Sequence, residues 1–245
     1  MGNIGELIAG GKAILGIEFG STRIKAVLID EAHKPIASGD HVWENRLENG
    51  FWTYHDDEIW AGLQDAYANL KKDVADKYDV KLTKVAALGF SAMMHGYLAF
   101  DKDGNLLVPF RTWRNSTTGP AAAELSQLFS YNIPERWSIS HLYQAILNGE
   151  DHVKDLAFFT TLAGYIHWRM TGEKVLGDGD ASGMFPIDTK TTQYDAVMMD
   201  KCEELIADRQ FAWNPAELLT EHSLSGANPG RRTAAGAKLL EQRVQ

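Results

Sequence analysis

The alternation of hydrophobic and polar residues at the start of the chain predicts three strands followed by a long helix. We expect strands at residues 14–19, 23–29 and 36–43, because each is short and rich in apolar or β-branched residues. Apolar residues then recur at helical spacing over residues 56–78, with Asp56 as the expected N-cap. The order predicts an antiparallel three-stranded meander beside a long helix.

A second set of patterns continues the chain beyond this helix. Residues 85–90 are apolar throughout, so we expect a central strand of the sheet. Residues 97–100 and 106–110 flank an Asp-Gly turn and predict a hairpin. Helical patterns follow at residues 120–129, 133–148, 155–170, 194–207 and 234–244. The whole order is typical of an α/β layer fold with a mixed sheet.

The chain of 245 residues divides into three parts on these patterns. Residues 1–12 lack the basic start and the apolar core of a signal peptide and are expected to form a flexible leader. Residues 13–222 carry the strands and helices of a domain large enough to bury a sizeable core. Residues 223–245 are rich in Pro, Gly and Ala, and predict a linker or the truncated start of a second domain.

Composition narrows the classes of partner. A formal net charge of −9 argues against binding to nucleic acid or to an anionic membrane surface. Cys202 is the single cysteine, so an intramolecular disulfide is excluded and the reducing cytoplasm is the expected location. No apolar run approaches the length of a membrane span.

A tight turn of small residues joins the first two expected strands. Glu18 stands near the end of the first strand, Gly20, Ser21 and Thr22 form the turn, and Lys25 follows. A glycine turn lets an anion approach backbone N–H groups, and a neighbouring carboxylate suits a Mg²⁺ ion that also binds phosphate oxygens. An ordinary hairpin with a solvated Glu and Lys explains the same residues. The stretch has neither the P-loop pattern nor the dinucleotide-binding fingerprint.

Met94, His95 and Gly96 lie just after the expected strand at residues 85–90. In open α/β sheets, ligands bind beyond the carboxyl ends of strands, and a His there can bond sugar hydroxyls. A surface turn with a structural His is the alternative, and the general abundance of such turns favours it for this stretch alone.

Trp113, Arg114 and Asn115 form a second candidate in a polar loop. An aromatic ring beside two groups that bind hydroxyls is a common way to hold a sugar. An exposed loop with one packed Trp is about as good an explanation. Asp178 and Asp180 offer carboxylates, but spaced Gly and Asp are also ordinary turn residues.

Several stretches together resemble a known family. The turn resembles the first phosphate loop of the sugar kinase/Hsp70/actin superfamily, apart from Glu18, which replaces an Asp. Further matching stretches follow in order at Gly50–Trp60, Leu88–Ser91, Met94–Gly96, Trp113–Asn115 and Tyr165–Met184. Over roughly residues 14–188 the chain is similar to the amino-terminal domain of an FGGY-family carbohydrate kinase, nearest the xylulokinase branch.

The resemblance implies a fold and an activity. The fold is a ribonuclease H-like, actin-like domain with a mixed sheet. The activity is transfer of the γ-phosphoryl group of ATP, with Mg²⁺, to a hydroxyl of a ketopentose-like sugar. The phosphate turn would face the transferred phosphate and the metal, and Glu18 would be the metal ligand. Met94, His95 and Gly96 would line the sugar site, and the loop of Trp113, Arg114 and Asn115 would cover it.

The family pattern is incomplete in this chain. Asn115 stands where the family has an acid, and residues 141–144 lack the Lys and the Trp of the family pattern. The general base and the adenosine site of the family belong to a second domain, and neither occurs before Gln245. We therefore expect an amino-terminal half that is inactive alone, with the carboxyl-terminal kinase domain as its missing partner. The sequence leaves the oligomeric state open, a homodimer included.

Two alternatives remain at this point. One is a non-catalytic sugar-binding module, and the other is an ATPase-like member of the superfamily. Sugar binding without ATP turnover would favour the first, and nucleotide binding without sugar binding would favour the second.

Overall fold

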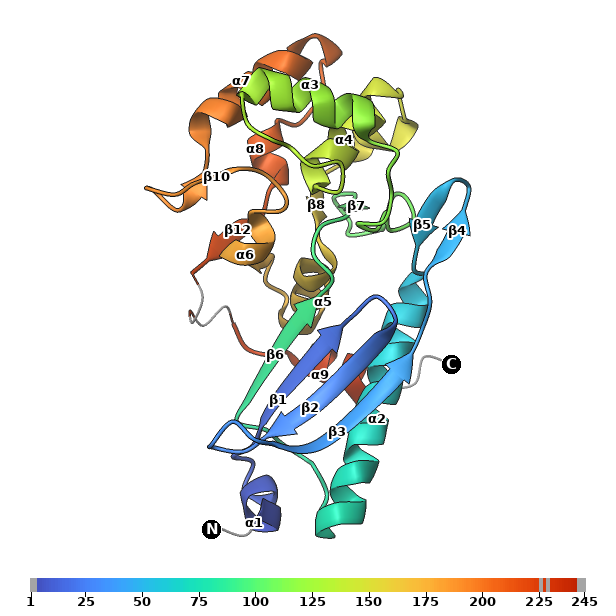
Figure 1. Cartoon of the computed structure of the whole chain (residues 1–245), viewed down its shortest axis with the longest axis vertical. Helices are drawn as coiled ribbons and strands as arrows, with labels where there is room; N and C mark the ends of the chain where they lie inside the picture. Colours follow the sequence, from blue (N-terminus) through green and yellow to red (C-terminus); the bar gives the residue numbers. More distant parts are fainter. Residues whose placement is uncertain (1–3, 225–226, 228–229, 242–245) are drawn as a thin grey trace. The chain divides into compact units, whose positions relative to one another are not determined.

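The computed structural model describes residues 4–224, 227 and 230–241, and divides the chain into two compact units (Figure 1). The first unit holds the residues up to Asn45, His55–Met93 and the described residues from Arg232 onward. The second unit holds Arg46–Tyr54 and Met94–Arg231. The expected domain 13–222 is thus shared between both units. No helix among the described residues is long and apolar enough to cross a membrane.

The first unit is built on the predicted meander. Its elements are α1 (Ile4–Ala9), β1 (Ile14–Phe19), β2 (Arg23–Ile29), β3 (Pro35–Val42), α2 (Asp56–Tyr78), β6 (Ala87–Ala92) and α9 (Ala234–Glu241). The sheet has the order β3-β2-β1-β6. The first three strands are antiparallel, and β6 runs parallel to β1. This mixed α/β sheet confirms the expected fold class.

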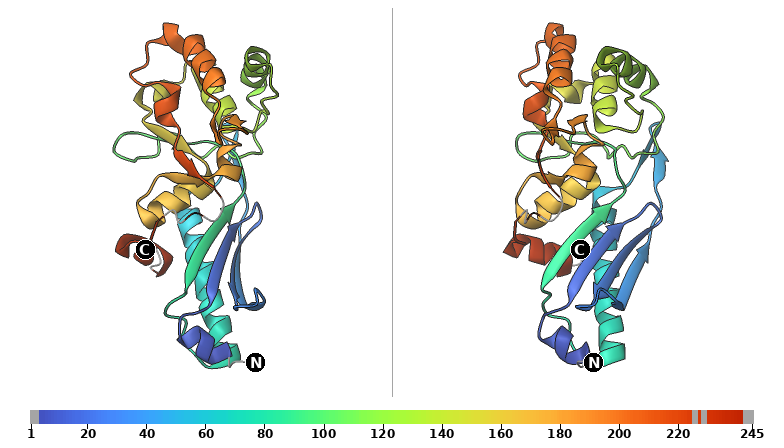
Figure 2. Two further views of the ribbon diagram at one scale, coloured as in Figure 1. Left: turned by 90° about the vertical axis from the view of Figure 1, so that its left-hand side faces the viewer. Right: turned by 60° about the vertical axis from the view of Figure 1, so that its left-hand side comes forward.

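One face of this sheet forms the core of the first unit. Alternate residues of β1 and β2, such as Leu15, Ile17 and Ile24, are almost fully buried. Helix α2 lies along β3 and β2, and α9 packs on α2, where the amide of Gln64 donates to the Leu239 carbonyl at 2.9 Å (Figures 1 and 2). The apolar stripe of α2 is buried, and this burial stabilises a helix as long as 23 residues.

Several expectations for this unit need correction. The strand predicted at residues 85–90 is present as β6, but its predicted central position is wrong. Strand β6 lies at the end of the described sheet, and its side chains alternate between exposed and half-buried. Its residues are mostly small, so an apolar pattern there does not mean deep burial. The expected leader contains helix α1, in which Ile8 is buried. Helix α2 begins at Asp56, so His55 and not Asp56 takes the N-cap position. The segment 223–245 contributes α9 to this unit.

The second unit consists of short strands and helices around one apolar cluster. Its strands are β4 (Arg46–Glu48), β5 (Phe51–Thr53), β7 (Leu98–Phe100), β8 (Phe158–Thr160), β9 (Val175–Gly177), β10 (Ile187–Asp188), β11 (Gln193–Tyr194) and β12 (Glu221–Ser223). Its helices are α3 (Gly119–Phe129), α4 (Ser138–Leu147), η1 (Asp151–Asp155), α5 (Leu162–Thr171), α6 (Asp178–Ala181), α7 (Ala196–Ile206), η2 (Ala207–Arg209) and α8 (Pro215–Leu218). Tyr97, Leu142, Phe159 and Phe185 are among its buried core residues.

The strand pairing of the second unit differs from the prediction. Strand β7 pairs with β8, whereas residues 106–110 contribute a single isolated bridge, Phe100 to Leu106, in the described part of the chain. The expected helix at 155–170 is split, because Thr161 caps a helix that starts at Leu162. Strands β9 and β12 pair in parallel. These pairings join segments distant in sequence, which a local pattern does not encode.

Candidate functional site

The phosphate turn belongs to the first unit and joins β1 to β2 as predicted. The Gly20 N–H donates to the Arg23 carbonyl at 3.0 Å, which closes the turn. The Trp43 indole donates to the Gly20 carbonyl at 2.8 Å, and the Trp43 N–H donates to the Thr22 carbonyl at 3.2 Å. Trp43 therefore holds the turn from one side, a role that the sequence patterns did not reveal.

Polar side chains form a row across the exposed face of the sheet beside this turn. Glu18 of β1 stands in register with Lys25 of β2 and with Ser91 of β6. The Lys25 ammonium lies 3.5 Å from the Glu18 carboxylate, and both side chains are about half exposed, at 52% and 55%. A carboxylate and an ammonium thus stand together at the open end of the turn, where a phosphate with a bound cation can reach both.

The His95 turn belongs to the second unit and has an unusual backbone. His95 has φ of 68° and Gly96 has φ of 87°, so two consecutive residues are left-handed. This conformation is uncommon for a non-glycine residue and costs on the order of 1 kcal/mol or more. Gly96 is required here, because a Cβ atom would lie 2.6 Å from the Arg111 carbonyl. Strain of this kind is concentrated at functional sites.

Hydrogen bonds with residues 136–138 hold this turn. The Gly96 N–H donates to the Arg136 carbonyl at 3.2 Å, and the Ser138 hydroxyl donates to the Gly96 carbonyl at 2.6 Å. The Ser138 N–H in turn donates to the Gly183 carbonyl at 3.2 Å. Residues 136–138 therefore fix the backbone that carries His95, and Gly183 is bonded to the same segment.

The imidazole of His95 packs against Gly183. A Cβ atom on Gly183 would lie only 2.4 Å from Nδ1 of His95, so a glycine is needed for this contact. The Nδ1 atom is buried without a well-formed hydrogen bond to any described residue. Burial lowers the pKa of His95, and the nearby Arg136 charge lowers it further. The neutral ring can donate to or accept from a hydroxyl, depending on its tautomer.

The Trp113 loop is joined to the His95 turn by a bridge between Tyr97 and Arg111. The Tyr97 N–H donates to the Arg111 carbonyl at 2.8 Å, and the reverse bond is 3.1 Å. Trp113 follows two residues later and is 40% exposed, while Met94 on the other side of the bridge is 44% exposed. The structure thus brings the two sugar-site candidates together in one unit.

The Asn115 side chain is used within the loop. It is buried, its Oδ1 accepts from the Trp52 N–H at 2.8 Å, and its Nδ2 donates to the Trp52 and Thr112 carbonyls at 2.9 and 3.0 Å. The Arg114 guanidinium lies 4.0 Å from the centre of the Trp52 ring. Trp52 of β5 is therefore part of the site, although the sequence placed it only in a loop.

Buried ionic and aromatic groups surround Arg111, which precedes the Trp113 loop. Arg111 is buried, and its guanidinium forms an ion pair with Glu150, which also lies 3.5 Å from His152. His141 stacks on Tyr97, and both of its ring nitrogens are buried without a hydrogen bond to any described residue. Complete burial lowers the pKa of His141 to about 3, so this ring is neutral.

The two aspartates of the Gly-rich stretch lie in α6 and both have partners. The Asp178 carboxylate is 2.8 Å from Nδ1 of His222. Thr161 donates to the Asp180 carboxylate, and burial raises the pKa of Asp180 to about 6. No group of three or more acidic, His or Cys side chains suited to a metal occurs among the described residues.

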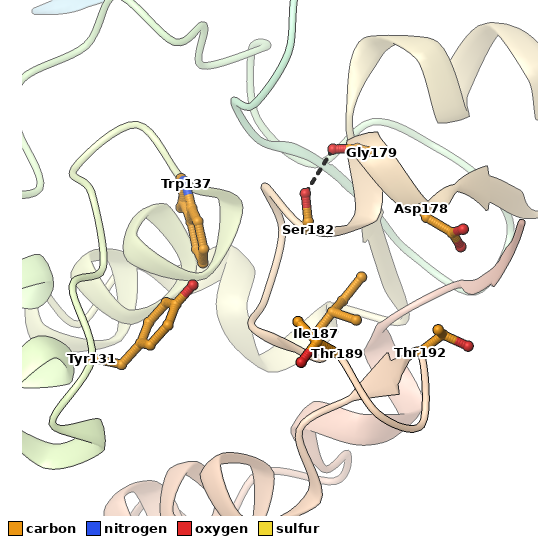
Figure 3. Close-up of a pocket in the computed structure, with 8 residues that line it drawn as sticks. All are labelled: Tyr131, Trp137, Asp178, Gly179, Ser182, Ile187, Thr189 and Thr192. Carbon is orange, nitrogen blue, oxygen red and sulfur yellow. Dashed lines mark hydrogen bonds between the residues drawn. The ribbon is translucent and has the colours of Figure 1, made fainter. Parts of the chain in front are cut away.

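The second unit contains a pocket of about 520 Å³ (Figure 3). Its lining residues are Tyr131, Trp137, Asp178, Gly179, Ser182, Ile187, Thr189 and Thr192. Trp137 precedes Ser138 and Ser182 precedes Gly183 in the chain, but neither Ser138 nor Gly183 lines the pocket. None of the sequence-predicted sugar-site residues lines this pocket, whereas Asp178, a candidate carboxylate in the sequence, does.

Comparison with known proteins identifies the family. Residues 13–209 match the amino-terminal domain of the FGGY family of carbohydrate kinases. The chain belongs to this family. The expected resemblance is thereby confirmed, as is its placement near the xylulose kinases, with glycerol kinases also among the relatives.

Individual FGGY relatives are distant in sequence but close in fold. The chain is 20% identical over 213 residues to the xylulose kinase of Staphylococcus xylosus, and the match covers 80% of this chain and 43% of that one. The ligand-bound xylulose kinase of Lactobacillus acidophilus has a TM-score of 0.77 at 19% identity, and the match covers 94% of this chain and 45% of that one. The Plasmodium falciparum glycerol kinase with ADP has a TM-score of 0.72 at 17% identity, covering 94% and 47%. The FGGY chain thus spans less than half the length of these relatives.

Proposed function

We propose that this chain is the sugar-binding half of an ATP-dependent carbohydrate kinase. The observation that carries the proposal is the His95 turn, a strained backbone held by residues 136–138 within a domain of the FGGY family. The whole enzyme would transfer the γ-phosphoryl group of ATP to a hydroxyl of a ketopentose-like sugar. The single buried Cys202 is consistent with the reducing cytoplasm as its location.

The sugar would bind against His95, Met94 and Trp113. The Nε2 atom of His95 would bond one hydroxyl, and the exposed Trp113 ring would cover the C–H face of the sugar. Gly96 and Arg114 complete this wall, and Asn115 keeps the loop in place through its bonds to Trp52. A neutral His95 suits a neutral sugar, because a hydroxyl can pair with either tautomer of the ring.

The phosphate turn would meet the transferred group. Gly20, Ser21 and Thr22 offer a turn without bulky side chains, and Lys25 supplies a positive charge for phosphate oxygens. Phosphoryl transfer depends mainly on positioning and on charge stabilisation, and both can come from such a turn.

The residues of this turn also fit Mg²⁺. The ion usually binds one or two carboxylates together with phosphate oxygens and water, and the half-exposed Glu18 provides one carboxylate. Glu18 would be its ligand, directly or through water, and the ion would offset charge on the phosphate oxygens. The general base is expected from the second domain and not from this chain.

Sugar binding and nucleotide turnover by the 245-residue chain test the proposal. We expect isothermal titration to detect weak binding of pentoses or polyols, and a coupled assay to detect no sugar-dependent ADP release, since the base is missing. ADP release that depends on sugar would contradict the assignment as one half of a kinase. Nucleotide binding without sugar binding would favour the ATPase-like alternative.

A further inference from the structure

Arg111 and Glu150 form a buried ion pair in the second unit. Nη1 of Arg111 donates to Oε1 of Glu150 at 3.2 Å, and Nη2 donates to Oε2, so the guanidinium and the carboxylate meet through two parallel bonds. Only 6% of the Arg111 side chain and 22% of the Glu150 side chain are exposed. A buried pair of this kind adds little net stability relative to apolar residues, but its two bonds hold both side chains in one orientation.

The backbone of Arg111 connects the two loops that carry the sugar-site candidates. Its N–H and its carbonyl exchange hydrogen bonds with Tyr97, two residues after His95. Its carbonyl also lies so close to Gly96 that a Cβ atom on that glycine would be 2.6 Å away. Trp113 follows two residues later in the chain. A shift of Arg111 would therefore change how the His95 turn and the Trp113 loop are placed relative to each other.

The side chain of Arg111 adds a third segment, strand β5. Its guanidinium carbon lies 4.2 Å from the centre of the Phe51 ring. The neighbouring Trp52 carbonyl accepts a hydrogen bond from the Thr112 N–H at 3.1 Å, and Trp52 also exchanges bonds with Asn115. Strand β5 therefore supports the loop between Thr112 and Asn115, and Arg111 packs against the same strand.

Glu150 is itself held by groups on both sides. Nδ2 of Asn148 donates to it at 3.2 Å, and Nδ1 of His152 lies 3.5 Å from it. Nε2 of His152 lies 3.1 Å from the Tyr97 hydroxyl, which closes a ring of contacts back to Arg111. Burial alone would raise the pKa of Glu150, but its bonds to Arg111 outweigh burial and lower the pKa, so the carboxylate is charged. Burial and the Arg111 charge lower the pKa of His152, so its ring is neutral.

We propose that Arg111 and Glu150 are positioning residues of the sugar site, which fix the His95 turn and the Trp113 loop relative to each other without touching the sugar themselves. This inference rests on the proposed function, because it concerns the same wall for a ketopentose-like sugar. A substitution that keeps the fold but removes the pair should therefore weaken sugar binding.

Titration of the ketopentose D-xylulose into the 245-residue chain and into Glu150→Gln tests the inference. The amide keeps the size of the side chain but loses one acceptor oxygen and the charge, so the two parallel bonds are broken. We expect the Kd to rise roughly fivefold, which corresponds to the loss of one hydrogen bond to the sugar. An unchanged Kd would overturn the inference.

Asp151→Asn is the matched control for this titration. It makes the same change from acid to amide at the next residue, whose exposed side chain lies 3.8 Å from Lys154 and belongs to a separate ion pair. The Kd for D-xylulose should not change in this variant. An equal loss of affinity in Asp151→Asn and Glu150→Gln would overturn the inference, because the effect would then come from net charge and not from the buried pair.

A double variant separates a positioning role from a structural one. Arg111→Met combined with Glu150→Leu replaces the pair by apolar side chains of similar size, a change that often keeps or raises stability. We expect this variant to unfold at a denaturant concentration close to that of the unsubstituted chain, and to bind D-xylulose as weakly as Glu150→Gln. Unchanged affinity in the folded double variant would overturn the inference. Loss of the folded state in both variants would also overturn it, since the pair would then serve folding itself.

His95→Ala separates this inference from the proposed function. Because the pair acts in part through the contact of His95 with the sugar, Glu150→Gln should weaken binding by a smaller factor when His95 is already Ala. Equal factors in both backgrounds would overturn the inference. If D-xylulose does not bind to the unsubstituted chain, the proposed sugar site fails and the inference fails with it. If His95→Ala weakens binding and the variants of the pair do not, the proposed sugar site stands and only the inference fails.

Discussion

Gly183→Ala is the substitution that examines the His95 site most selectively. The new Cβ atom would lie 2.4 Å from Nδ1 and 2.8 Å from Cε1 of His95, whereas ordinary contacts between such atoms are about 3.5–4 Å. The imidazole must therefore move by about 1 Å. The side chain can turn away more easily than the main chain, because Gly96 and its hydrogen bonds fix the backbone.

We expect Gly183→Ala to weaken sugar binding by the free energy of one hydrogen bond, the bond between His95 and a sugar hydroxyl. Such a bond contributes on the order of 1 kcal/mol, so we expect about a fivefold increase in the Kd for the sugar. The free energy of unfolding should change by less than about 1 kcal/mol, because φ of Gly183 is not positive and alanine can adopt its backbone.

A titration of sugar into Gly183→Ala, His95→Ala and the double variant measures this effect. Because both single changes remove the same contact, the double variant should bind as weakly as His95→Ala alone. Gly177→Ala is the control, since a Cβ atom there meets no atom within 4 Å. Additive losses in the double variant, or unchanged binding in Gly183→Ala, would refute the reasoning that this glycine positions His95.

Three further predictions concern catalysis and stability. In an enzyme that contains the complete second domain, Glu18→Gln should lower kcat at least about tenfold, which corresponds to about 1.4 kcal/mol of activation free energy. The affinity for the sugar should be retained, and steady-state kinetics would measure both quantities. Glu18→Asp should also impair the rate and shift its Mg²⁺ dependence if the turn has adapted to the longer acid, and wild-type rates in Glu18→Gln would exclude a role for the carboxylate. The folded pKa of His141 is about 3, well below the ordinary 6.5, so its contribution to stability is present above pH 6.5 and is lost as the pH falls toward 3. Chemical denaturation should therefore show the chain losing about 1 kcal/mol more than His141→Leu between pH 7 and 5.5, and parallel pH profiles would contradict a neutral buried imidazole.

The sequence predicted the parts of the fold that depend on local patterns. The strands β1 to β3 and the helix α2 follow from alternation and from helical spacing, and the structure confirms them within one or two residues. The pairing of β7 with β8 was missed, because it joins residues 58 to 62 positions apart, as in Phe100 with Phe158 and Leu98 with Thr160. The edge position of β6 was also missed, because small residues look apolar whether or not they are buried.

The site was predictable only in part for the same reason. His95 and Gly96 were found because they follow a strand, and their strained backbone supports a functional role. Trp52 and Gly183 were not found as site residues, because their roles arise from contacts with Asn115 and His95 in the folded chain. The pocket at Tyr131 combines residues from three segments, so no single stretch of sequence indicates it.

The most direct test of the account is an amide chemical-shift map of the 245-residue chain during titration with neutral sugars. We predict that the largest shifts occur at Met94–Gly96, Trp113 and Gly183, and that they disappear in His95→Ala while the rest of the spectrum is preserved. Shifts confined to other residues, or no saturable shift with any sugar of the panel, would contradict the claim that the His95 turn is the sugar site of a carbohydrate kinase.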